Sequence, residues 1–432
     1  MVGLAFGDEG KGSAIDFFSR MLPTAVVGRF NGGPQAAHHV LTPGGREHVF
    51  AQFGSGLFVP GVKSQSLKAV YFDPLAALQE YHVLEGKGVR LAGRLHFSPE
   101  CPIVTPFHQA LGQLRELSRT HRHGSCGLGV GELFQDERAG SVVLRAGDLY
   151  RPDRRRLLGT IREHLKEKAM NLGSIDHPRA RKAMDLFRDD LAFDYYISKI
   201  DEFLEMIDPP QRFPAPVIFE GAQGALLDRR YGFFPHVSVT DSTALHALNA
   251  YRLGIIRTIW TRHGPGPFPT EDERIVCPPD RYNGNNFWQG PVRHGWLDLV
   301  LLRYALSFLR IDALGLTCMD HAVDRDFFVN RAYQLPAGLT DAEEFFEINA
   351  NGQAISIHQL PQSLMEQERL TKLLFHCRPV LEELPAPSRS GDVVEAPALV
   401  EYLFRETGKE VLFFSAGPTA TGKTWRGPLI GT

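Results

Sequence analysis

Short apolar runs recur along the chain, and each one leads into a glycine-rich or polar turn. They read VGLAFG, TAVVGRF, VIFEG, IIRTIW, ALGLTCMD and EVLFFSAG. Continuous apolar runs of this length, bounded by turn residues, are typical of parallel strands that are buried on both faces. Between several of them lie stretches with apolar residues three and four apart, such as Ser13 to Met21 and Asp298 to Leu309. The alternation predicts an α/β fold with a mainly parallel central sheet flanked by helices.

The expected domain organisation follows from where this alternation is interrupted. The stretch from about Tyr150 to Met206 is more helical in pattern and more highly charged than the rest of the chain. It predicts a helical, charged subdomain, residues 150–206, within a single domain that spans residues 1–432. Two segments, 272–292 and 384–392, are rich in Pro, Gly, Asn or Ser and are expected to be loops.

Charge and cysteine content narrow the classes of function. The formal net charge is −3, from 47 Lys and Arg against 50 Asp and Glu. A chain without a global positive field is a poor candidate for binding nucleic acid or an anionic membrane. The five cysteines are scattered and form no C-x-x-C pair. This argues against a disulfide framework or a zinc site and fits the reducing cytoplasm.

Nothing in the sequence predicts export or a membrane span. The start, MVGLAFGDEG, carries two acidic side chains and no long apolar core, so no signal peptide is expected. No uninterrupted apolar run approaches the roughly 20 residues that cross a bilayer. We therefore expect a soluble, cytoplasmic protein.

Near its end the chain matches the nucleotide-binding pattern G-x-x-x-x-G-K-[ST], at Gly417 to Thr424, GPTATGKT. The pattern binds phosphate only when the loop opens a helix, whose free N–H groups and dipole then face the anion. After Thr424 only eight residues remain, WRGPLIGT, with a proline and two glycines among them. A helix of useful length cannot follow, so the phosphates must be sought elsewhere.

The first residues hold a second candidate, the loop GDEGKG from Gly7 to Gly12. A strand-like run precedes it and an amphipathic stretch begins at Ser13, which is the context that the C-terminal match lacks. Glycines let the backbone approach an anion, Lys11 adds a mobile charge, and Asp8 could bind a divalent metal or act as a base. The alternative is a solvent-exposed turn before a helix.

Further motifs accompany this loop in a fixed order. They read RFNGGPQAAHHVL, FEGAQGALLD, TRHGPGPFPTE, VRHGWLD, PVLEELPAP and SAGP. In identity, order and spacing the set resembles the adenylosuccinate synthetase family, essentially over the whole chain. The resemblance implies the family's P-loop-NTPase-like fold and a homodimer. It also implies a GTP-hydrolysing ligase that uses Mg²⁺, phosphorylates the 6-oxo group of IMP, and displaces the phosphate with the amine of aspartate to give adenylosuccinate.

The resemblance also implies roles for individual residues. Asp8 corresponds to the base that takes the purine N1 proton, and Lys11 to a phosphate contact. His38 corresponds to the acid near O6, and Gln223 to the residue that holds the N1/O6 edge; His39 is treated as a bystander. The implied GTP-binding residues are Gly7, Glu9, Gly10, Lys11, Gly12, Asp320, Ser415, Gly417 and Pro418. The implied purine nucleotide-binding residues are Gln35, Ser125, Cys126, Arg138, Gln223 and Ser238, with Arg138 as the arginine that reaches the other subunit's nucleotide. Asp8 and Ala37 are the implied metal positions.

Several positions depart from the family pattern. Asp320 matches the aspartate that accepts from guanine N1 and N2, but Cys318 stands where the family has a lysine. Thr419-Ala420 replaces an Asp-Arg pair, which makes GPTATGKT a base-binding or C-terminal loop. At the 5′-phosphate site Ser125 and Cys126 replace paired threonines and Leu128 replaces an arginine. Gln35 replaces an asparagine. Because Ser125 can still donate to phosphate and Ser238 can stand in for another family threonine, a nucleoside monophosphate is still expected.

The amine site departs furthest. The family has an arginine-rich loop before GWLD that grips both carboxylates of aspartate, where the forked guanidinium geometry matters. Counting back from Trp296 puts Gly290 and Val292 at two of those positions and leaves Arg293 for the amine substrate, with Phe287 and Trp288 as added aromatic bulk. Either an insertion shifts this alignment or the amine has changed.

Three hypotheses stay open at this point. The first is an adenylosuccinate synthetase that acts on IMP, GTP and aspartate. The second is a paralogue that couples another amine or nucleotide in a specialised pathway. The third is a catalytically silent nucleotide-binding protein, which the retention of Asp8, Lys11, His38 and Gln223 disfavours because a binder needs no base.

Overall fold

The computed structural model describes residues 1–22, 25–120, 125–208, 216–278, 287–288, 290–336, 338–339 and 341–428. The chain forms two compact units. We call residues 1–17, 40–45 and 221–432 the first unit, and residues 18–39 and 46–220 the second unit. Helix α1 (Lys11–Met21) and strand β3 (His38–Leu41) lie where the chain passes from one unit to the other.

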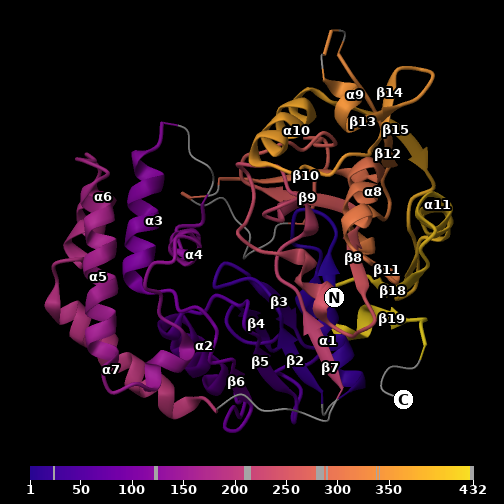
Figure 1. Ribbon diagram of the computed structural model, residues 1–432. Helices are drawn as coiled ribbons and strands as arrows, with labels where there is room; N and C mark the ends of the chain where they lie inside the picture. Colours follow the sequence, from indigo (N-terminus) through magenta and orange to yellow (C-terminus); the bar gives the residue numbers. More distant parts are fainter. Residues whose placement is uncertain are drawn as a thin grey trace. The chain divides into compact units, whose positions relative to one another are not determined.

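The first unit is built on a five-stranded sheet with the order β1-β8-β11-β18-β19. Figure 1 labels four of these strands, β8, β11, β18 and β19. The first four strands of the sheet run parallel, and only β19 is antiparallel to its neighbour. The strands are β1 (Val2–Gly3), β8 (Leu253–Arg257), β11 (Ala313–Thr317), β18 (Val411–Ser415) and β19 (Lys423–Trp425). Every residue of β8 and β11 is buried, as expected for strands at the centre of a parallel sheet.

A second, mixed sheet of the first unit has the order β13-β14-β12-β10-β9, with β15 also paired to β12. Its strands are β9 (Ile259–His263), β10 (Val292–Asp298), β12 (Phe327–Gln334), β13 (Phe346–Ile348), β14 (Gln353–Ile357) and β15 (Arg378–Leu384). The remaining elements of this unit are α8 (Leu299–Phe308), α9 (Ala342–Phe345), α10 (Leu364–His376), α11 (Pro397–Thr407) and the hairpin strands β16 (Ser388–Ser390) and β17 (Val393–Glu395).

The second unit holds a four-stranded parallel sheet with the order β6-β5-β2-β7. Its strands are β2 (Val26–Arg29), β5 (Lys63–Ser66), β6 (Leu95–Phe97) and β7 (Val217–Glu220), and β4 (Glu47–Phe50) lies outside this sheet. Its helices are α2 (Pro74–Gly86), α3 (Pro106–Ser118), α4 (Val130–Arg138), α5 (Arg154–Met170), α6 (Pro178–Leu186) and α7 (Asp190–Met206). Helices α5 to α7 occupy most of residues 150–206, the stretch expected to be helical.

The prediction of an α/β fold with mainly parallel sheets is confirmed. The helix expected from Ser13 is α1, and the one expected from Asp298 is α8, for which Asp298 is the N-cap. Two local predictions are wrong. The run IIRTIW is not one strand, because β8 ends at Arg257 and β9 begins at Ile259. The expected loop 384–392 contains β16, which pairs with β17.

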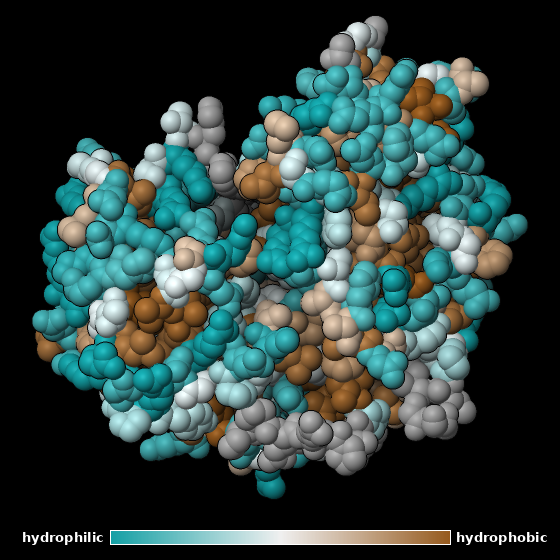
Figure 2. Space-filling model, viewed as in Figure 1, coloured by the Kyte–Doolittle hydropathy of each residue, from teal (hydrophilic) through white to brown (hydrophobic). Residues whose placement is uncertain are grey.

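The surface is mostly polar where it can be seen. In Figure 2 hydrophilic residues cover most of the visible face of each unit, and hydrophobic residues reach it in separate patches. Among the described residues, no helix combines the length and the apolar character needed to cross a bilayer.

Candidate active site

Most candidate residues of the first unit lie at one edge of its parallel sheet. Asp8 follows β1, Arg257 ends β8, Asp320 follows β11, and Gly417 follows β18. These four strands are parallel, so their carboxyl ends meet at the same edge. Open α/β sheets bind ligands outside the carboxyl ends of their strands. The fold therefore places the N-terminal loop and the two segments expected to hold a purine base at the edge where a nucleotide would bind.

The loop between β1 and α1 is held together by its own glutamate. Glu9 is fully buried. Its carboxylate accepts hydrogen bonds from the backbone N–H of Ala5 at 3.1 Å, of Gly7 at 2.9 Å, and from Lys11 Nζ at 2.5 Å. A Cβ on Gly3 would lie 2.1 Å from a carboxylate oxygen of Glu9, so only glycine fits there. Glu9 and Lys11, both expected to contact GTP, therefore form an ion pair that shapes the loop.

Asp8 is presented by this loop in a strained conformation. Its φ is 58°, in the left-handed region that costs a residue other than glycine about 1–3 kcal/mol. Arg257 Nη1 donates to the Asp8 carbonyl at 2.9 Å, and the Asp8 carboxylate lies 3.2 Å from His263 Nε2. Burial raises the pKa of Asp8, but His263, Arg257 and Lys11 together lower it below its usual value. Asp8 is therefore ionised at neutral pH, as a base must be.

The FEGAQG segment packs against the same loop, although the two are far apart in the sequence. The N–H of Leu226 donates to the carbonyl of Ala5 at 3.0 Å. A Cβ on Gly224 would lie 2.1 Å from the same carbonyl, so the glycine permits this close approach. Gln223, directly before it, also has a positive φ, 62°. The structure thus brings Gln223 into the segment that contacts the Asp8 loop.

Ser238 lies farther along the same unit. Its hydroxyl shares a hydrogen bond of 2.8 Å with the hydroxyl of Thr240, and its N–H donates to the carbonyl of Leu227 at 2.8 Å. The backbone contact ties Ser238 to the turn that follows Gln223.

The segments expected to hold the purine base of GTP contact each other directly. The N–H of Gly417 donates to the Asp320 carboxylate at 2.9 Å. Cys318 has a φ of 51°, and its carbonyl accepts from the Thr258 hydroxyl at 2.7 Å. After Ser415 and Pro418 the chain forms one short 3-10 turn, Ala420–Gly422, and then β19. Because a strand and not a helix follows GPTATGKT, the loop lacks the helix N-terminus that a P-loop needs.

The second unit carries the residues expected at the 5′-phosphate. Ser125 and Cys126 lie just before α4, and the Ser125 hydroxyl accepts from the N–H of Gly127 at 3.2 Å. Burial raises the pKa of the Cys126 thiol, so it is neutral at physiological pH. A helix N-terminus preceded by a glycine turn is suited to bind an anion. Arg138 is the exposed last residue of α4, with its guanidinium 5.9 Å from the Phe134 ring.

His38 is oriented by a carboxylate in the same unit. Its Nδ1 lies 2.5 Å from an Oε of Glu220, the last residue of β7. Glu220 also accepts from the Ser55 N–H at 3.0 Å and from the Ser55 hydroxyl. Burial raises the pKa of Glu220, but the charge and hydrogen bond of His38, the charge of Arg29 and the Ser55 hydroxyl lower it to about 2. The ionised Glu220 therefore fixes the ring of His38 and favours its protonated form.

Gln35 and Ala37 lie between β2 and β3 of the second unit. Gln35 Oε1 is buried and has no hydrogen-bond partner among the described residues, so it can accept from a ligand. Ala37 is exposed, and it could hold a metal only through its carbonyl oxygen. Within the described part of the chain no group of three or more His, Cys, Asp or Glu could hold a metal ion.

Arg293, the expected contact of the amine substrate, is engaged by the protein itself. Its Nη1 donates to Glu271 at 2.7 Å, and its Nη2 donates to the carbonyls of Gly264 at 2.7 Å and Gly266 at 2.9 Å. Gly290 has a φ of 83° with open space around it. Much of the expected amine loop, residues 279–286 and 289, lies outside the described residues. Arg293 can hold a carboxylate of a substrate only by sharing its guanidinium with Glu271.

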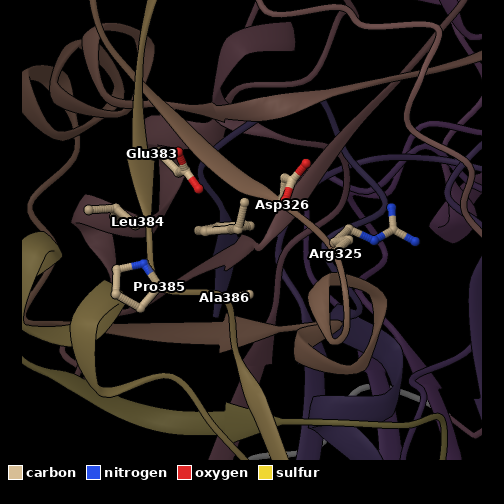
Figure 3. A pocket seen from close by; sticks show the side chains of 7 residues that line it. Arg325, Asp326, Glu383, Leu384, Pro385 and Ala386 are labelled. Atoms are coloured by element: carbon tan, nitrogen blue, oxygen red, sulfur yellow. The ribbon is translucent and has the colours of Figure 1, made fainter.

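A groove of about 360 Å³ lies in the first unit between the start of β12 and the end of β15. It is lined by Arg325, Asp326, Phe327, Glu383, Leu384, Pro385 and Ala386. Figure 3 shows the side chain of Arg325 extending away from the Glu383–Ala386 segment, and its Nη2 donates to the carbonyl of Val276 at 2.9 Å. None of the predicted site residues lines this groove, and its two carboxylates make it unsuited to phosphate.

Sequence reasoning missed several residues that support the site. Glu220 and His263 were both inside quoted motifs, FEGAQG and TRHGPGPFPTE, but carried no assigned role. Arg257 and Thr317 end neighbouring strands and bond the carbonyls of Asp8 and Glu9, Thr317 at 2.8 Å. Their signal in the sequence was a polar residue at the end of a buried apolar run.

Taken together, these features define a class of protein. A strand, a glycine-rich loop with an ionised aspartate and a helix lie at the carboxyl edge of a parallel sheet, and a glutamate-oriented histidine lies in the second unit. These features are typical of a nucleotide-dependent enzyme that transfers a phosphoryl group. A family model described as adenylosuccinate synthetase matches residues 1–420. The chain belongs to the adenylosuccinate synthetase family, and it is a ligase.

Individual relatives agree with this assignment. The adenylosuccinate synthetase of Shewanella frigidimarina is 33% identical over 335 residues, which cover 74% of this chain and 76% of that protein. That of Shewanella piezotolerans is 30% identical over 412 residues, covering 87% of this chain and 93% of the relative. The resemblance inferred from the ordered motifs is thereby confirmed.

Two solved structures share the fold. The fully ligated adenylosuccinate synthetase from Plasmodium falciparum matches with a TM-score of 0.73 and 20% identity, over 99% of both chains. The succinoaminodeoxyadenylate synthetase of cyanophage S-2L, bound to dGMP and dATP, matches with a TM-score of 0.55 and 14% identity, over 99% of this chain and 94% of that one. At these identities the likeness shows the fold alone.

Proposed function

We propose that this protein is a GTP-dependent ligase that joins IMP and aspartate to form adenylosuccinate. The observation that carries the proposal is the family match over residues 1–420. The motifs that contain Asp8, Lys11, His38 and Gln223 support it. The family and its relatives favour this activity over a paralogue with another amine and over a silent binder. The three substrates are small molecules.

The first step transfers the γ-phosphoryl group of GTP to O6 of the purine, and GDP leaves. The purine N1–H must lose its proton as O6 becomes nucleophilic. Asp8 is suited to accept that proton because His263 and Arg257 keep its carboxylate ionised. Gln223, in the segment packed on the Asp8 loop, is suited to hold the N1/O6 edge through its side-chain amide.

His38 supplies positive charge in this step. With Nδ1 turned toward Glu220, the protonated ring keeps Nε2–H as a second donor. That donor would stabilise charge on the transferring phosphoryl oxygens. The role of Glu220 is to hold the ring and keep it protonated, so it is a positioning residue and not a catalytic one.

In the second step the amine of aspartate attacks C6, and the C6–O bond breaks. The former O6 leaves as part of inorganic phosphate, and the amine nitrogen loses a proton. Arg293 is the proposed contact of an aspartate carboxylate. Because Glu271 already binds this guanidinium, we propose that the guanidinium is shared between the two carboxylates.

We propose Mg²⁺ as the cofactor, with the Asp8 carboxylate and the Ala37 carbonyl as its protein ligands. The residues fit such an ion, because Mg²⁺ is usually held by one or two protein oxygens together with substrate phosphates. When bound, it would offset the negative charge of the phosphates. The loop backbone would contact the phosphates of GTP, and the Ser125–Gly129 turn would contact the 5′-phosphate of IMP.

We also propose that the protein acts in the cytoplasm as a homodimer. The exposed guanidinium of Arg138, at the end of α4, is the candidate that reaches the nucleotide of the other subunit. Sedimentation at assay concentration should show a dimer, and a fully active monomer would exclude this role.

The proposal is tested by product identification. Purified protein is incubated with GTP, Mg²⁺ and IMP, with and without aspartate, and the products are identified by mass spectrometry. Equal amounts of adenylosuccinate, GDP and phosphate are expected, and only with aspartate present. Parallel reactions with dGMP and with other amino acids test the paralogue, which would be favoured if product formed only there.

A further inference from the structure

Lys423 is the lysine of the C-terminal match to G-x-x-x-x-G-K-[ST]. It has no role in the proposed mechanism, yet it is buried. Its relative exposure is 7%. It begins β19, opposite Ser415 of β18. A buried ammonium is costly unless it is paired or hydrogen-bonded, so its surroundings show what it does.

Lys423 binds the backbone of the base-binding loop. Its Nζ donates to the carbonyl of Thr419 at 2.8 Å and to that of Gly417 at 3.2 Å. The loop is closed around it, because the N–H of Ala416 donates to the carbonyl of Gly422 at 2.9 Å. A Cβ on Gly422 would lie 2.0 Å from the carbonyl of Ala416. The ammonium thus bridges two carbonyls inside the tight hairpin between β18 and β19, whose tip contains Gly417.

The same hairpin tip binds Asp320. The N–H of Gly417 donates to Oδ1 of Asp320 at 2.9 Å, while Oδ2 lies 4.0 Å from His321 Nε2. Lys423 therefore acts on Asp320 through one residue, Gly417, whose carbonyl binds the ammonium and whose N–H binds the carboxylate. The lysine expected near Asp320 from the family pattern is Cys318 in this chain, so Lys423 brings a cation to the same region from a different strand.

We propose that Lys423 is a positioning residue of the nucleoside triphosphate's base site. It fixes Gly417 so that one oxygen of Asp320 accepts from the loop and the other accepts from the N–H groups of guanine. This inference rests on the proposed use of GTP. By this inference Lys423 serves recognition of the base and not binding of the phosphates.

The electrostatic surroundings of Lys423 agree with this role. Burial lowers the pKa of its ammonium to about 8, against the opposing effects of Cys318, Asp16 and Asp320. His321, on the turn after β11, is a further titratable group at Asp320, and its pKa is lowered, mainly by burial. The charge of His321 is therefore already lost below neutral pH, whereas Lys423 changes charge near pH 8.

The test compares Lys423→Met and Lys423→Arg with the wild type in the adenylosuccinate assay. Methionine keeps the length of the side chain and removes the charge and the donors, whereas arginine keeps both. Lys423→Met should raise the GTP KM about tenfold or more, as expected for losing charge-assisted hydrogen bonds. The kcat and the IMP KM should stay within about twofold, and Lys423→Arg should recover part of the loss. Lys372→Met, exposed on α10, is the matched control and should change nothing.

Two further measurements keep the test decisive. The ratio of kcat/KM for GTP to that for ITP, which lacks the 2-amino group, should fall in Lys423→Met. In the wild type, which needs no substitution, the GTP KM should rise as the pH passes through about 8. A GTP KM that is unchanged in Lys423→Met would overturn the inference. If Lys423→Met does not fold, a GTP KM of the wild type that stays constant with pH would overturn it instead. Wild-type protein that forms no adenylosuccinate would instead contradict the proposed function.

Discussion

Replacing Glu220 with glutamine tests how the structure sets the state of His38. The glutamine has nearly the same shape, but it carries no charge and its amide nitrogen cannot accept a hydrogen bond. Glu220 is 1% exposed and meets His38 Nδ1 at 2.5 Å. The ring would lose the partner that favours its protonated form, while Ser55 could still donate to the new amide oxygen.

The size of the effect follows from the pKa of Glu220. It is lowered from 4.5 to about 2, although burial alone would raise it. At about 1.4 kcal/mol per pKa unit, this lowering corresponds to about 3 kcal/mol of net interaction with the ionised carboxylate. His38, Arg29 and Ser55 share this interaction, so the part lost from His38 is smaller. We expect kcat to fall by roughly 10- to 100-fold.

The assay is steady-state formation of adenylosuccinate, with the free energy of unfolding measured on the same samples. The KM values for GTP and aspartate should change little, because neither substrate is expected to touch Glu220. Glu163→Gln, exposed on α5 of the same unit, is the matched control. A kcat for Glu220→Gln within twofold of the wild type, in a folded protein, would refute the positioning role.

Three further predictions concern single side chains of the first unit. Asp8→Asn should lower kcat at least about 100-fold with an unchanged melting temperature, since the amide cannot accept the N1 proton; a rate near that of the wild type would exclude Asp8 as the base. Arg293→Lys should raise the aspartate KM about tenfold, because the forked geometry is lost, and an unchanged KM would remove Arg293 from the amine site. Burial raises the pKa of Asp298 to about 6, above the usual 3.8 of an aspartate, despite hydrogen bonds from Tyr333, Asn330 and Leu301. The folded state thus binds this proton more tightly, and the free energy of unfolding should fall by up to about 3 kcal/mol between about pH 4 and pH 6. Urea unfolding should show a shallower decline in Asp298→Asn, and parallel wild-type and mutant profiles would contradict this.

Much of the fold was predictable because the signals were local. The apolar runs that became β2, β7, β8, β11 and β18 are each only four or five residues long. Strands β2, β8 and β11 are buried at every position, which leaves no polar alternation to read. The break at Thr258 was missed because apolar residues resume directly after it, at Ile259. The side chain of Thr258 bonds the carbonyl of Cys318, a contact that only tertiary structure creates.

The site was predictable in its motifs but not in its internal pairing. Glu9 and Lys11 were both expected to contact GTP, yet they bind each other, because the fold buries both in the loop after β1. The pairing of His38 with Glu220 joins positions far apart in the sequence, and no spacing rule connects them. The strained φ of Asp8 and Gln223 likewise depends on packing around them.

Transfer of an oxygen isotope tests the central claim most directly. IMP labelled with ¹⁸O at position 6 is converted in the presence of GTP, Mg²⁺ and aspartate, and the inorganic phosphate is analysed by mass spectrometry. If GTP phosphorylates O6 before the amine displaces it, one ¹⁸O atom appears in each phosphate that accompanies adenylosuccinate. Phosphate without the label, released while adenylosuccinate forms, would contradict the account.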